Sequence, residues 1–419
     1  MSSIVSARSR VGCLICLLAV AYAGQCDIPR RNAELESLRD RGDLRLQRRH
    51  AWELLGHWTR GIGAAPAFES WWGEGAAFAR SAAVAVPGIR GFARAPADTG
   101  GAATGGHDAT VSGDIPVLAY TLYNQAAYDH IRRHRLHLQT ELQRLRARGP
   151  ADPGLPARRS IPAFPADSMV LKTAWWPVAA QGITPLPVWD AGLNEARRSG
   201  NDYLTWNRIV AVDPAPGTDA GRRVDMEFAG REFGRVQRVR LGDFYGVTLD
   251  EDLAQRLARD ASATKLALLV LGRPLRSGDH LILVAANLAT REIADWIWAA
   301  YWWHDRAAVG PFAADRPSAA GAPWNHFLMQ VAFDERTPLG ADGSPHICFN
   351  PWLEARFADG GQGGGTVSNC LACHRRASFP AAGFLPVTRG APDVARDPAY
   401  EPGRLGVNFN WSLALHALP

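Results

Sequence analysis

Five residues near the carboxyl end of the 419-residue chain have the types and the spacing that attach a haem covalently. They are Cys370-Leu371-Ala372-Cys373-His374, which matches the pattern C-x-x-C-H. Two thiols one helical turn apart can form thioethers with the two vinyl groups of one haem, and the adjacent imidazole can bind the iron. The motif predicts one covalent haem c, with Cys370 and Cys373 as its anchors and His374 as the proximal iron ligand.

A structural zinc site, a thioredoxin-like dithiol and a plain disulfide are the alternatives. Zinc requires two more ligands at suitable spacing, and beyond residue 26 the chain offers no second C-x-x-C, only Cys348 and scattered histidines. A thioredoxin-like pair follows a strand early in a βαβ unit, whereas this motif lies close to the carboxyl end. Haem is therefore favoured, and a structural protein with a metal or a disulfide at C-x-x-C-H stays as a third interpretation.

The sequence leaves the second axial ligand of the iron open. Small cytochromes c place a methionine after the motif, but no methionine follows His374. Upstream, His326 and Met329 lie just before and inside a predicted strand, and His304 follows an aromatic segment. Met329, His326 and His304 are the candidate distal ligands. Without such a ligand the iron would be open to small molecules.

The amino-terminal residues predict export. Arg8 and Arg10 precede a short apolar segment, and residues 21–23 read A-Y-A, a signal-peptidase site. Residues 1–23 are expected to be a signal peptide that is cleaved after Ala23, which predicts a periplasmic protein. Elsewhere the sequence has no run of about 20 apolar residues that would form a transmembrane helix.

The remaining cysteines and the charge are less informative. Cys26 and Cys348 could form a disulfide in an oxidising compartment or stay as free thiols. The net charge of +5 comes almost wholly from arginine, because Lys172 and Lys265 are the only lysines. A GC-rich genome explains this bias more simply than docking to an acidic partner does. A redox partner protein is expected, with a small molecule as a second partner if the iron is open, and export argues against nucleic acid.

Hydrophobic patterning predicts an α+β fold, with amino-terminal helices, a mainly antiparallel β body and a short haem-bearing helix near the carboxyl end. Residues 24–113 are expected to form a helical segment and a Gly/Ala-rich connector, and residues 114–419 the haem-binding domain. Helices are predicted over 34–60 and 122–148. Strands are predicted over residues 170–177, 186–189, 206–212, 236–241, 281–286 and 327–333.

The segment 296–305 is the most aromatic part of the chain. As a strand it would place Trp296, Trp298, Trp302 and His304 on one face, because side chains alternate along a strand. As a helix it would place the aromatic side chains all around the axis. We interpret this segment as one wall of a haem pocket, and a core strand with a polar end is the simpler alternative.

The residues that flank the motif have expected roles as well. Ser368 is expected to cap the helix that presents the two cysteines. Arg375 and Arg376 are candidates to pair with the haem propionates, although exposure to water explains them equally well.

Four segments together resemble a known family; they are residues 168–176, 327–334, 370–374 and 408–412. Their order resembles the β-sheet cytochromes called c-prime-beta and their hydroxylamine-oxidising relatives with a lysine-cross-linked haem, in which an antiparallel sheet precedes C-x-x-C-H. The resemblance implies a distal haem face that is open to small ligands and His374 as the only protein ligand. It makes Lys172 a conceivable cross-linking residue, although a surface lysine is the simpler interpretation. Residues 180–320 have no counterpart in that family.

One-electron transfer is the leading function that the sequence predicts. The alternative is a haem enzyme or a protein that binds a small ligand, such as a gas, at an open distal site. A simple electron carrier needs only about 100 residues, so the long body argues mildly against a bare shuttle.

Overall fold

A computed structural model describes most of the chain, in the residue ranges 32–60, 65–80, 116–152, 155–190, 202–215, 217, 219–318, 320–335, 347–354, 369–381 and 397–419. The predicted signal peptide, Cys26, Ser368 and most of the Gly/Ala-rich connector lie outside these ranges. The described residues confirm the α+β class, with helices first, mainly antiparallel sheets and a short helix at the carboxyl end.

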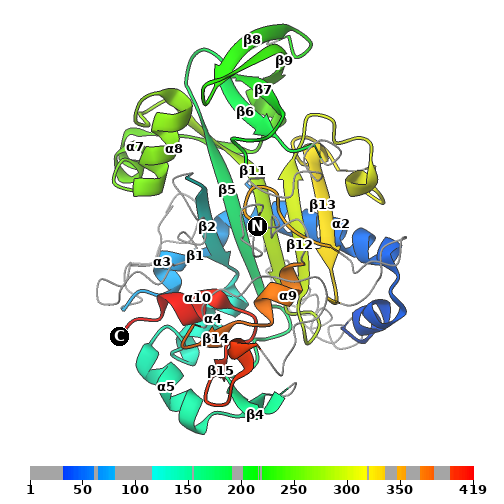
Figure 1. Cartoon of the computed structure of the whole chain (residues 1–419), viewed down its shortest axis with the longest axis vertical. Coiled ribbons are helices and arrows are strands. Elements are labelled where there is room, and N and C mark those ends of the chain that lie inside the picture. The colour runs from blue at the N-terminus through cyan, green and yellow to red at the C-terminus, as the bar shows by residue number, and fades with distance from the viewer. Residues whose placement is uncertain are drawn as a thin grey trace, which may run out of the picture.

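A seven-stranded antiparallel sheet forms the centre of the molecule (Figure 1). Its strands pair in the order β1-β2-β5-β11-β12-β13, and β10 pairs with the outer part of β11. The predicted strands at 170–177, 281–286 and 327–333 are confirmed as parts of β5, β11 and β13. The strands are β1 (Trp72–Gly73), β2 (Leu118–Tyr123), β5 (Met169–Val178), β10 (Gly246–Thr248), β11 (His280–Thr290), β12 (Ile297–Trp303) and β13 (Phe327–Ala332).

Two smaller sheets lie at opposite ends of the long strand β5 (Figure 1). The upper sheet has the order β6-β7-β9-β8 and contains the other three predicted strands. Its strands are β6 (Thr184–Val188), β7 (Arg208–Asp213), β8 (Arg223–Phe228) and β9 (Arg231–Arg240). The lower sheet has the order β14-β15-β4-β3. Its strands are β3 (Ala151–Asp152), β4 (Leu155–Ser160), β14 (Ser378–Phe379) and β15 (Leu405–Gly406).

Short helices connect and cover these sheets. Among the described residues, none of them is long and apolar enough to cross a membrane. Residues 32–41 are also helical. The α-helices are α2 (Leu44–Thr59), α3 (Glu74–Ala77), α4 (Gln125–Arg133), α5 (Gln139–Arg148), α7 (Glu251–Leu257), α8 (Ala261–Leu271), α9 (Cys370–His374) and α10 (Trp411–His416). The 3₁₀ helices are η1 (Ala67–Ser70), η4 (Leu241–Asp243), η5 (Pro311–Ala313), η6 (Trp324–His326) and η8 (Pro398–Tyr400).

The two long helices that the sequence predicts are each broken. The first, over 34–60, is interrupted where Gly42 adopts a positive φ of 62° and the Asp43 side chain caps α2. The second, over 122–148, begins as strand β2 instead of as a helix, and it is divided again around Arg135, whose φ is 53°. Apolar periodicity alone does not reveal such breaks, because apolar residues are buried both before and after each break.

Different helices cover the two faces of the central sheet. Side chains alternate along β12, and Tyr301 points toward α2, where its hydroxyl donates to the Ala51 carbonyl at 2.6 Å. Trp298 points the opposite way, toward α9, with its ring 4.0 Å from that of His374. We refer to these as the α2 face and the α9 face. Figure 1 shows α2 behind the sheet and α9 in front of it.

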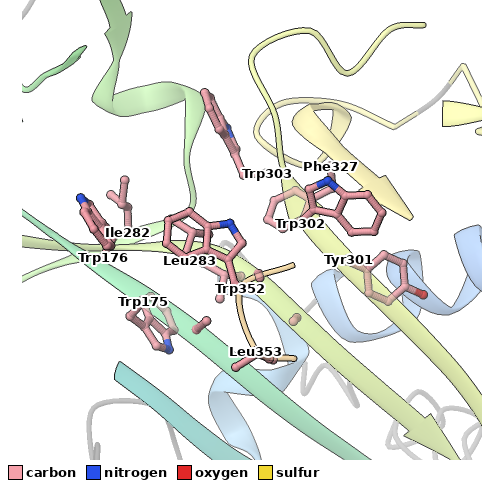
Figure 2. Packing of buried hydrophobic residues seen from close by; sticks show 14 of the residues in the cluster. Trp175, Trp176, Ile282, Leu283, Tyr301, Trp302, Trp303, Phe327, Trp352 and Leu353 are labelled. Carbon is pink, nitrogen blue, oxygen red and sulfur yellow. The ribbon is translucent and has the colours of Figure 1, made fainter. Parts of the chain in front are cut away.

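Large aromatic side chains fill much of the interior (Figure 2). Trp352 packs edge-on against Trp176, with ring centroids 5.4 Å apart, and against Trp206, at 4.9 Å. Each such side chain buries a large apolar area, and edge-to-face pairs add about 0.5–1.5 kcal/mol beyond that area. Trp352 thereby holds the segment 347–354 on the sheet.

The amino-terminal residues share this interior. Trp58 of α2 packs against Tyr301 at 5.9 Å and Phe68 at 5.3 Å, and β1 pairs with β2 in the central sheet. The expected boundary between residues 113 and 114 therefore does not separate two hydrophobic cores.

Candidate haem-attachment site

Helix α9 carries the whole C-x-x-C-H motif. Its amino-terminal cap is Asn369, whose side-chain oxygen accepts from the Ala372 amide at 2.9 Å. The sequence prediction placed this cap at Ser368, whereas the structure has it at the next residue, Asn369, and asparagine and serine cap equally well. Cys370 and Cys373 are buried, with exposed fractions of 6% and 9%. The helix presents both thiols to the protein interior, on the α9 face.

His374 is held in one tautomer. A carbonyl oxygen only accepts, so the 2.8 Å contact from His374 Nδ1 to the Phe409 carbonyl requires that Nδ1 carries the proton. Nε2 is then the nitrogen that carries the lone pair. Burial and the positive charge of Lys172 together lower the pKa of His374 to about 4, although the hydrogen bond to Phe409 acts in the opposite direction. The imidazole is neutral at physiological pH, as a metal ligand must be.

The backbone that supplies this carbonyl is strained. Asn408 and Phe409 have positive φ values of 48° and 66°. This left-handed conformation costs a bulky residue such as Phe409 roughly 1–2 kcal/mol, whereas asparagine adopts it readily. The side chain of Asn408 accepts from the Trp296 indole at 3.2 Å, which helps to hold the turn. Trp296 itself has a φ of 63°. Two strained aromatic residues and Asn408 therefore lie around the hydrogen bond that orients His374.

The α9 face of the sheet carries an unusual row of polar side chains. The strand register places Lys172, Asn287 and Gln330 in one row across β5, β11 and β13, with Ala300 of β12 between the last two. Polar residues in the middle of a buried sheet are costly unless they are paired. The part of the sheet beneath α9 therefore differs chemically from the α2 face.

Glu354 joins this row to the motif. Its carboxylate accepts from the Asn350 amide at 2.7 Å and from the Asn287 side chain, and it lies 3.8 Å from the Cys370 sulfur. Burial raises the pKa of Glu354 to about 7, although these donors and Lys172 favour the charged form. A carboxyl group that titrates near neutral pH thus lies next to one of the two cysteines.

The unusual pKa of Glu354 predicts a pH-dependent stability of the haem-free protein. Since the folded-state pKa of about 7 exceeds the ordinary 4.5, this group stabilises the fold fully below pH 4.5, and that contribution is lost as the pH rises through 7. Glu354→Gln is expected to remove a slope worth up to roughly 3 kcal/mol between pH 4.5 and 8. Urea unfolding at several pH values measures it. The exposed Glu401→Gln is the control, and equal slopes in Glu354→Gln and the unsubstituted protein would contradict the assignment.

Cys348 lies beside the motif. It is 1% exposed, and its sulfur is 3.8 Å from that of Cys370. The three cysteines that the structure describes, Cys348, Cys370 and Cys373, are free thiols. The pairing with Cys26 that the sequence leaves open involves a residue outside the described ranges.

The two arginines after the motif pair with protein carboxylates. Arg375 contacts Asp295 at 2.8 Å and Glu335 at 3.4 Å, and Arg376 contacts Asp397 at 2.6 Å. The expectation that they pair with haem propionates gains no support, because both guanidinium groups have partners within the fold.

The structure does not bring the three candidate distal ligands to His374. Met329 is paired directly with Tyr301 and therefore lies on the α2 face, on the other side of the sheet. His326 stacks on Trp303, with ring centroids 5.8 Å apart, at the far end of β12. Strands rise about 3.3 Å per residue, so that end lies roughly 15–20 Å along β12 from Trp298. Of the expected pocket wall, Trp298 lies against the His374 ring, and Trp296 lies beside Trp298, with ring centroids 6.4 Å apart.

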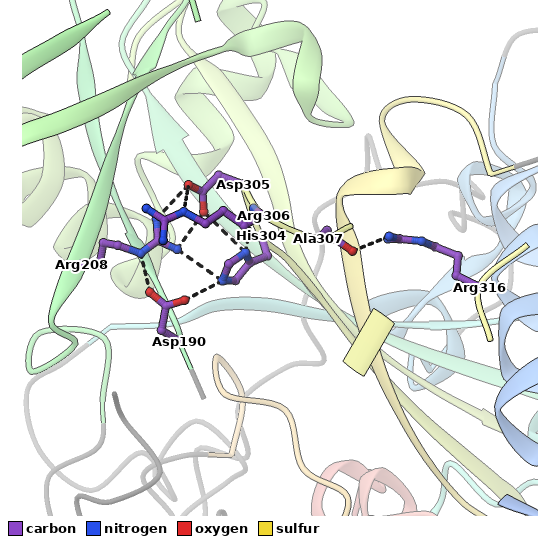
Figure 3. Close-up of polar contacts among 7 residues, drawn as sticks. All are labelled: Asp190, Arg208, His304, Asp305, Arg306, Ala307 and Arg316. Atoms are coloured by element: carbon purple, nitrogen blue, oxygen red, sulfur yellow. Dashed lines mark hydrogen bonds and ion pairs between the residues drawn. The ribbon is translucent and has the colours of Figure 1, made fainter. Parts of the chain in front are cut away.

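His304 belongs to a buried ion-pair network instead of an iron site (Figure 3). Its Nδ1 accepts from the Arg306 amide at 2.8 Å, and its Nε2 donates to Asp190 at 3.0 Å, so both nitrogens are used. Arg208 binds Asp305 through two bonds of 2.8 Å and also binds Asp190. Burial would raise the pKa of Asp190, but the bonds from His304 and Arg208 outweigh it and hold that pKa well below its usual range.

Sequence reasoning missed Glu354, Asn287 and Phe409. Asn287 alone carried a signal, since it interrupts an otherwise apolar strand. Glu354 and Phe409 lie in loops, where no periodicity indicates which way a group points.

Comparisons with known proteins add no family to this picture. Searches against protein-family models, curated proteins and solved structures gave no match for this chain. Within the described ranges, no group of three or more histidine, cysteine, aspartate or glutamate side chains is arranged to hold a metal ion.

Proposed function

We propose that the chain is an exported c-type cytochrome with one covalently bound haem, and that its function is one-electron transfer. The observation that carries this proposal is the hydrogen bond that His374 Nδ1 donates to the Phe409 carbonyl at 2.8 Å, which leaves the Nε2 lone pair as the one that could bind iron. The periplasm is the proposed compartment, on the evidence of the amino-terminal sequence.

The donor set at α9 fits a c-type haem. Cys370 and Cys373 lie one turn apart on one helix as free thiols, and thioether formation requires both. His374 follows on the same helix as a neutral imidazole, and a hydrogen bond to the non-ligating nitrogen is the arrangement that orients and strengthens a histidine ligand. When bound, haem would supply an iron centre that changes oxidation state by one electron.

The surroundings of His374 would favour electron transfer in two ways. The left-handed turn at 408–409 fixes the imidazole through a rigid carbonyl contact, which limits reorganisation at the iron. Trp298 stacks at 4.0 Å on the ring and shields it from water. Burial of a charged centre in this way tunes its reduction potential.

Binding of a small ligand at the iron is the second candidate function. The observation that favours it is the position of Met329, His326 and His304, none of which lies on the His374 side of the sheet within reach of the motif. An iron with His374 as its only protein ligand would be open on the distal side, as the resemblance to the c-prime-beta cytochromes also implies.

Optical spectra of the haem-loaded protein, with and without carbon monoxide, separate the two functions. A reduced low-spin spectrum that carbon monoxide leaves unchanged would mean that two protein ligands hold the iron, and it would support electron transfer. A high-spin spectrum that shifts on addition of carbon monoxide would mean an open distal side, and ligand binding would then replace electron transfer as the function.

A further inference from the structure

The structure describes three cysteines at α9, and two of them, Cys370 and Cys373, belong to the motif. Cys348 and Asn369 are bridge partners in adjacent parallel backbone segments, which places Cys348 beside the first turn of α9. The Cys370 sulfur lies 3.5 Å from the Cys348 carbonyl oxygen and 3.8 Å from the Cys348 sulfur. Cys373 lies one turn further along the same helix. The Cys370 thiol is thus in contact with a thiol from outside the motif.

The position of Cys348 is fixed by its neighbours. The amide of Phe349 donates to Gln330 at 3.0 Å, and the Asn350 side chain donates to Asn287 at 2.8 Å. Trp352 anchors the same segment in the aromatic interior. Because these contacts hold the backbone on the sheet, the approach of the two sulfurs is built into the fold.

We propose that Cys348 and Cys370 form a disulfide in the exported chain before haem attachment, and that this bond must be reduced before Cys370 can form its thioether. The second half of the proposal rests on the proposed haem function, whereas the first half does not. Disulfides persist in the compartment that the amino-terminal sequence predicts. The sulfurs must approach from 3.8 Å to about 2.05 Å for the bond to form.

Formation of the Cys348–Cys370 disulfide needs an oxidant, and a disulfide in a small molecule or in another protein can act as that oxidant. The Cys370 thiolate attacks one sulfur of that oxidant, forms a mixed disulfide and releases one thiolate. Cys348 then loses its proton and attacks the Cys370 sulfur, which releases the second thiolate. Two cysteine thiols lose two protons and two electrons, and the oxidant disulfide becomes two thiols.

Burial decides when this exchange occurs. Both sulfurs are almost fully covered in the folded protein, at 1% and 6% exposure. The hydrogen bond with Cys348, together with burial, raises the pKa of the Cys370 thiol, which keeps it protonated and slow to react. The bond is therefore expected to form while the segment 347–354 docks and to be shielded afterwards.

Disulfide mapping of the full mature chain, made without haem-attachment machinery, tests the first half. The protein is refolded in buffers of reduced and oxidised glutathione, alkylated, cleaved without reduction and analysed by mass spectrometry. The expected result is a peptide pair linked through Cys348 and Cys370, with Cys373 alkylated; Cys26→Ser should give the same pair. A dominant Cys370–Cys373 or Cys26–Cys348 bond, or no bond at all, would overturn the proposal.

Haem attachment in the presence of increasing thiol reductant tests the second half. In the unsubstituted chain, haem yield should rise severalfold with reductant, and in Cys348→Ser it should depend on reductant much less. Equal dependence in the two proteins would overturn this half. If neither protein acquires haem at any reductant concentration, the proposed haem function fails, and the disulfide map still decides the first half.

Discussion

Replacement of Cys370 and Cys373 together by alanine is expected to abolish covalently bound haem completely. Thioethers form only at these two sulfurs in the motif, and both are free thiols in the structure. After denaturing electrophoresis, the haem-stained band of the unsubstituted protein should be absent from the double variant when both are made with the same maturation machinery. The loss should occur without loss of the polypeptide.

Cys348→Ala is the matched control for this experiment. Cys348 is buried, with its sulfur 3.8 Å from that of Cys370, yet it is not part of the motif. Its variant should keep the stained band. Retention of haem by the double variant, or loss of haem only in Cys348→Ala, would mean that the C-x-x-C-H motif does not hold haem.

Arg208→Ala is expected to destabilise the protein by about 3–5 kcal/mol, the cost of leaving buried charges unpaired. The substitution removes one guanidinium group from two carboxylates, Asp190, which keeps its bond from His304, and Asp305, whose side chain is only 1% exposed. Because Asp190 and Arg208 belong to the upper sheet region and Asp305 follows β12, the network joins two parts of the fold (Figure 3). Urea unfolding of the two proteins at pH 7 measures the difference.

Arg306→Ala provides the comparison for Arg208. Arg306 also approaches Asp305, at 3.8 Å, but its side chain is 59% exposed. An exposed ion pair contributes about 0–1 kcal/mol, so this variant should unfold almost as the unsubstituted protein does. If Arg208→Ala cost no more than Arg306→Ala, the network would not join the two parts of the fold in the way described.

Much of the β body could be predicted from the sequence. Runs of branched and aromatic residues bounded by Gly, Pro and Asp marked β5, β6, β7, β9, β11 and β13, because such residues fit a buried pleated surface. The aromatic segment at 296–305 was ambiguous between helix and strand, and the structure shows strand β12. Pairing order and the division of each strand between two faces did not follow from local pattern, since they depend on contacts distant in sequence.

The helical predictions are right over most of their length and wrong at the start of the second helix. Residues 122 and 123 were placed in that helix, but they pair with β5 in the central sheet. Tertiary pairing outweighs helix propensity where both fit the same apolar residues.

The candidate site likewise contains residues that the sequence predicted and residues that it did not. Cys370, Cys373 and His374 could be identified because covalent haem chemistry requires fixed spacing along the chain. Glu354, Phe409 and Cys348 could not, since they reach α9 from loops through the fold, and no spacing rule connects them to the motif. Met329 was a distal candidate because it lies near the motif in the sequence. Side chains alternate along a strand, however, and the Met329 side chain lies on the α2 face.

The most direct test of covalent haem binding is the intact mass of the denatured protein. The mature chain is expressed with the c-type haem machinery, exported, unfolded and measured, next to a known cytochrome c as a maturation control. The result expected from the proposed function is the mass of the polypeptide plus one haem. The bare polypeptide mass, with the control cytochrome fully loaded, would contradict the assignment of α9 as a haem-attachment site.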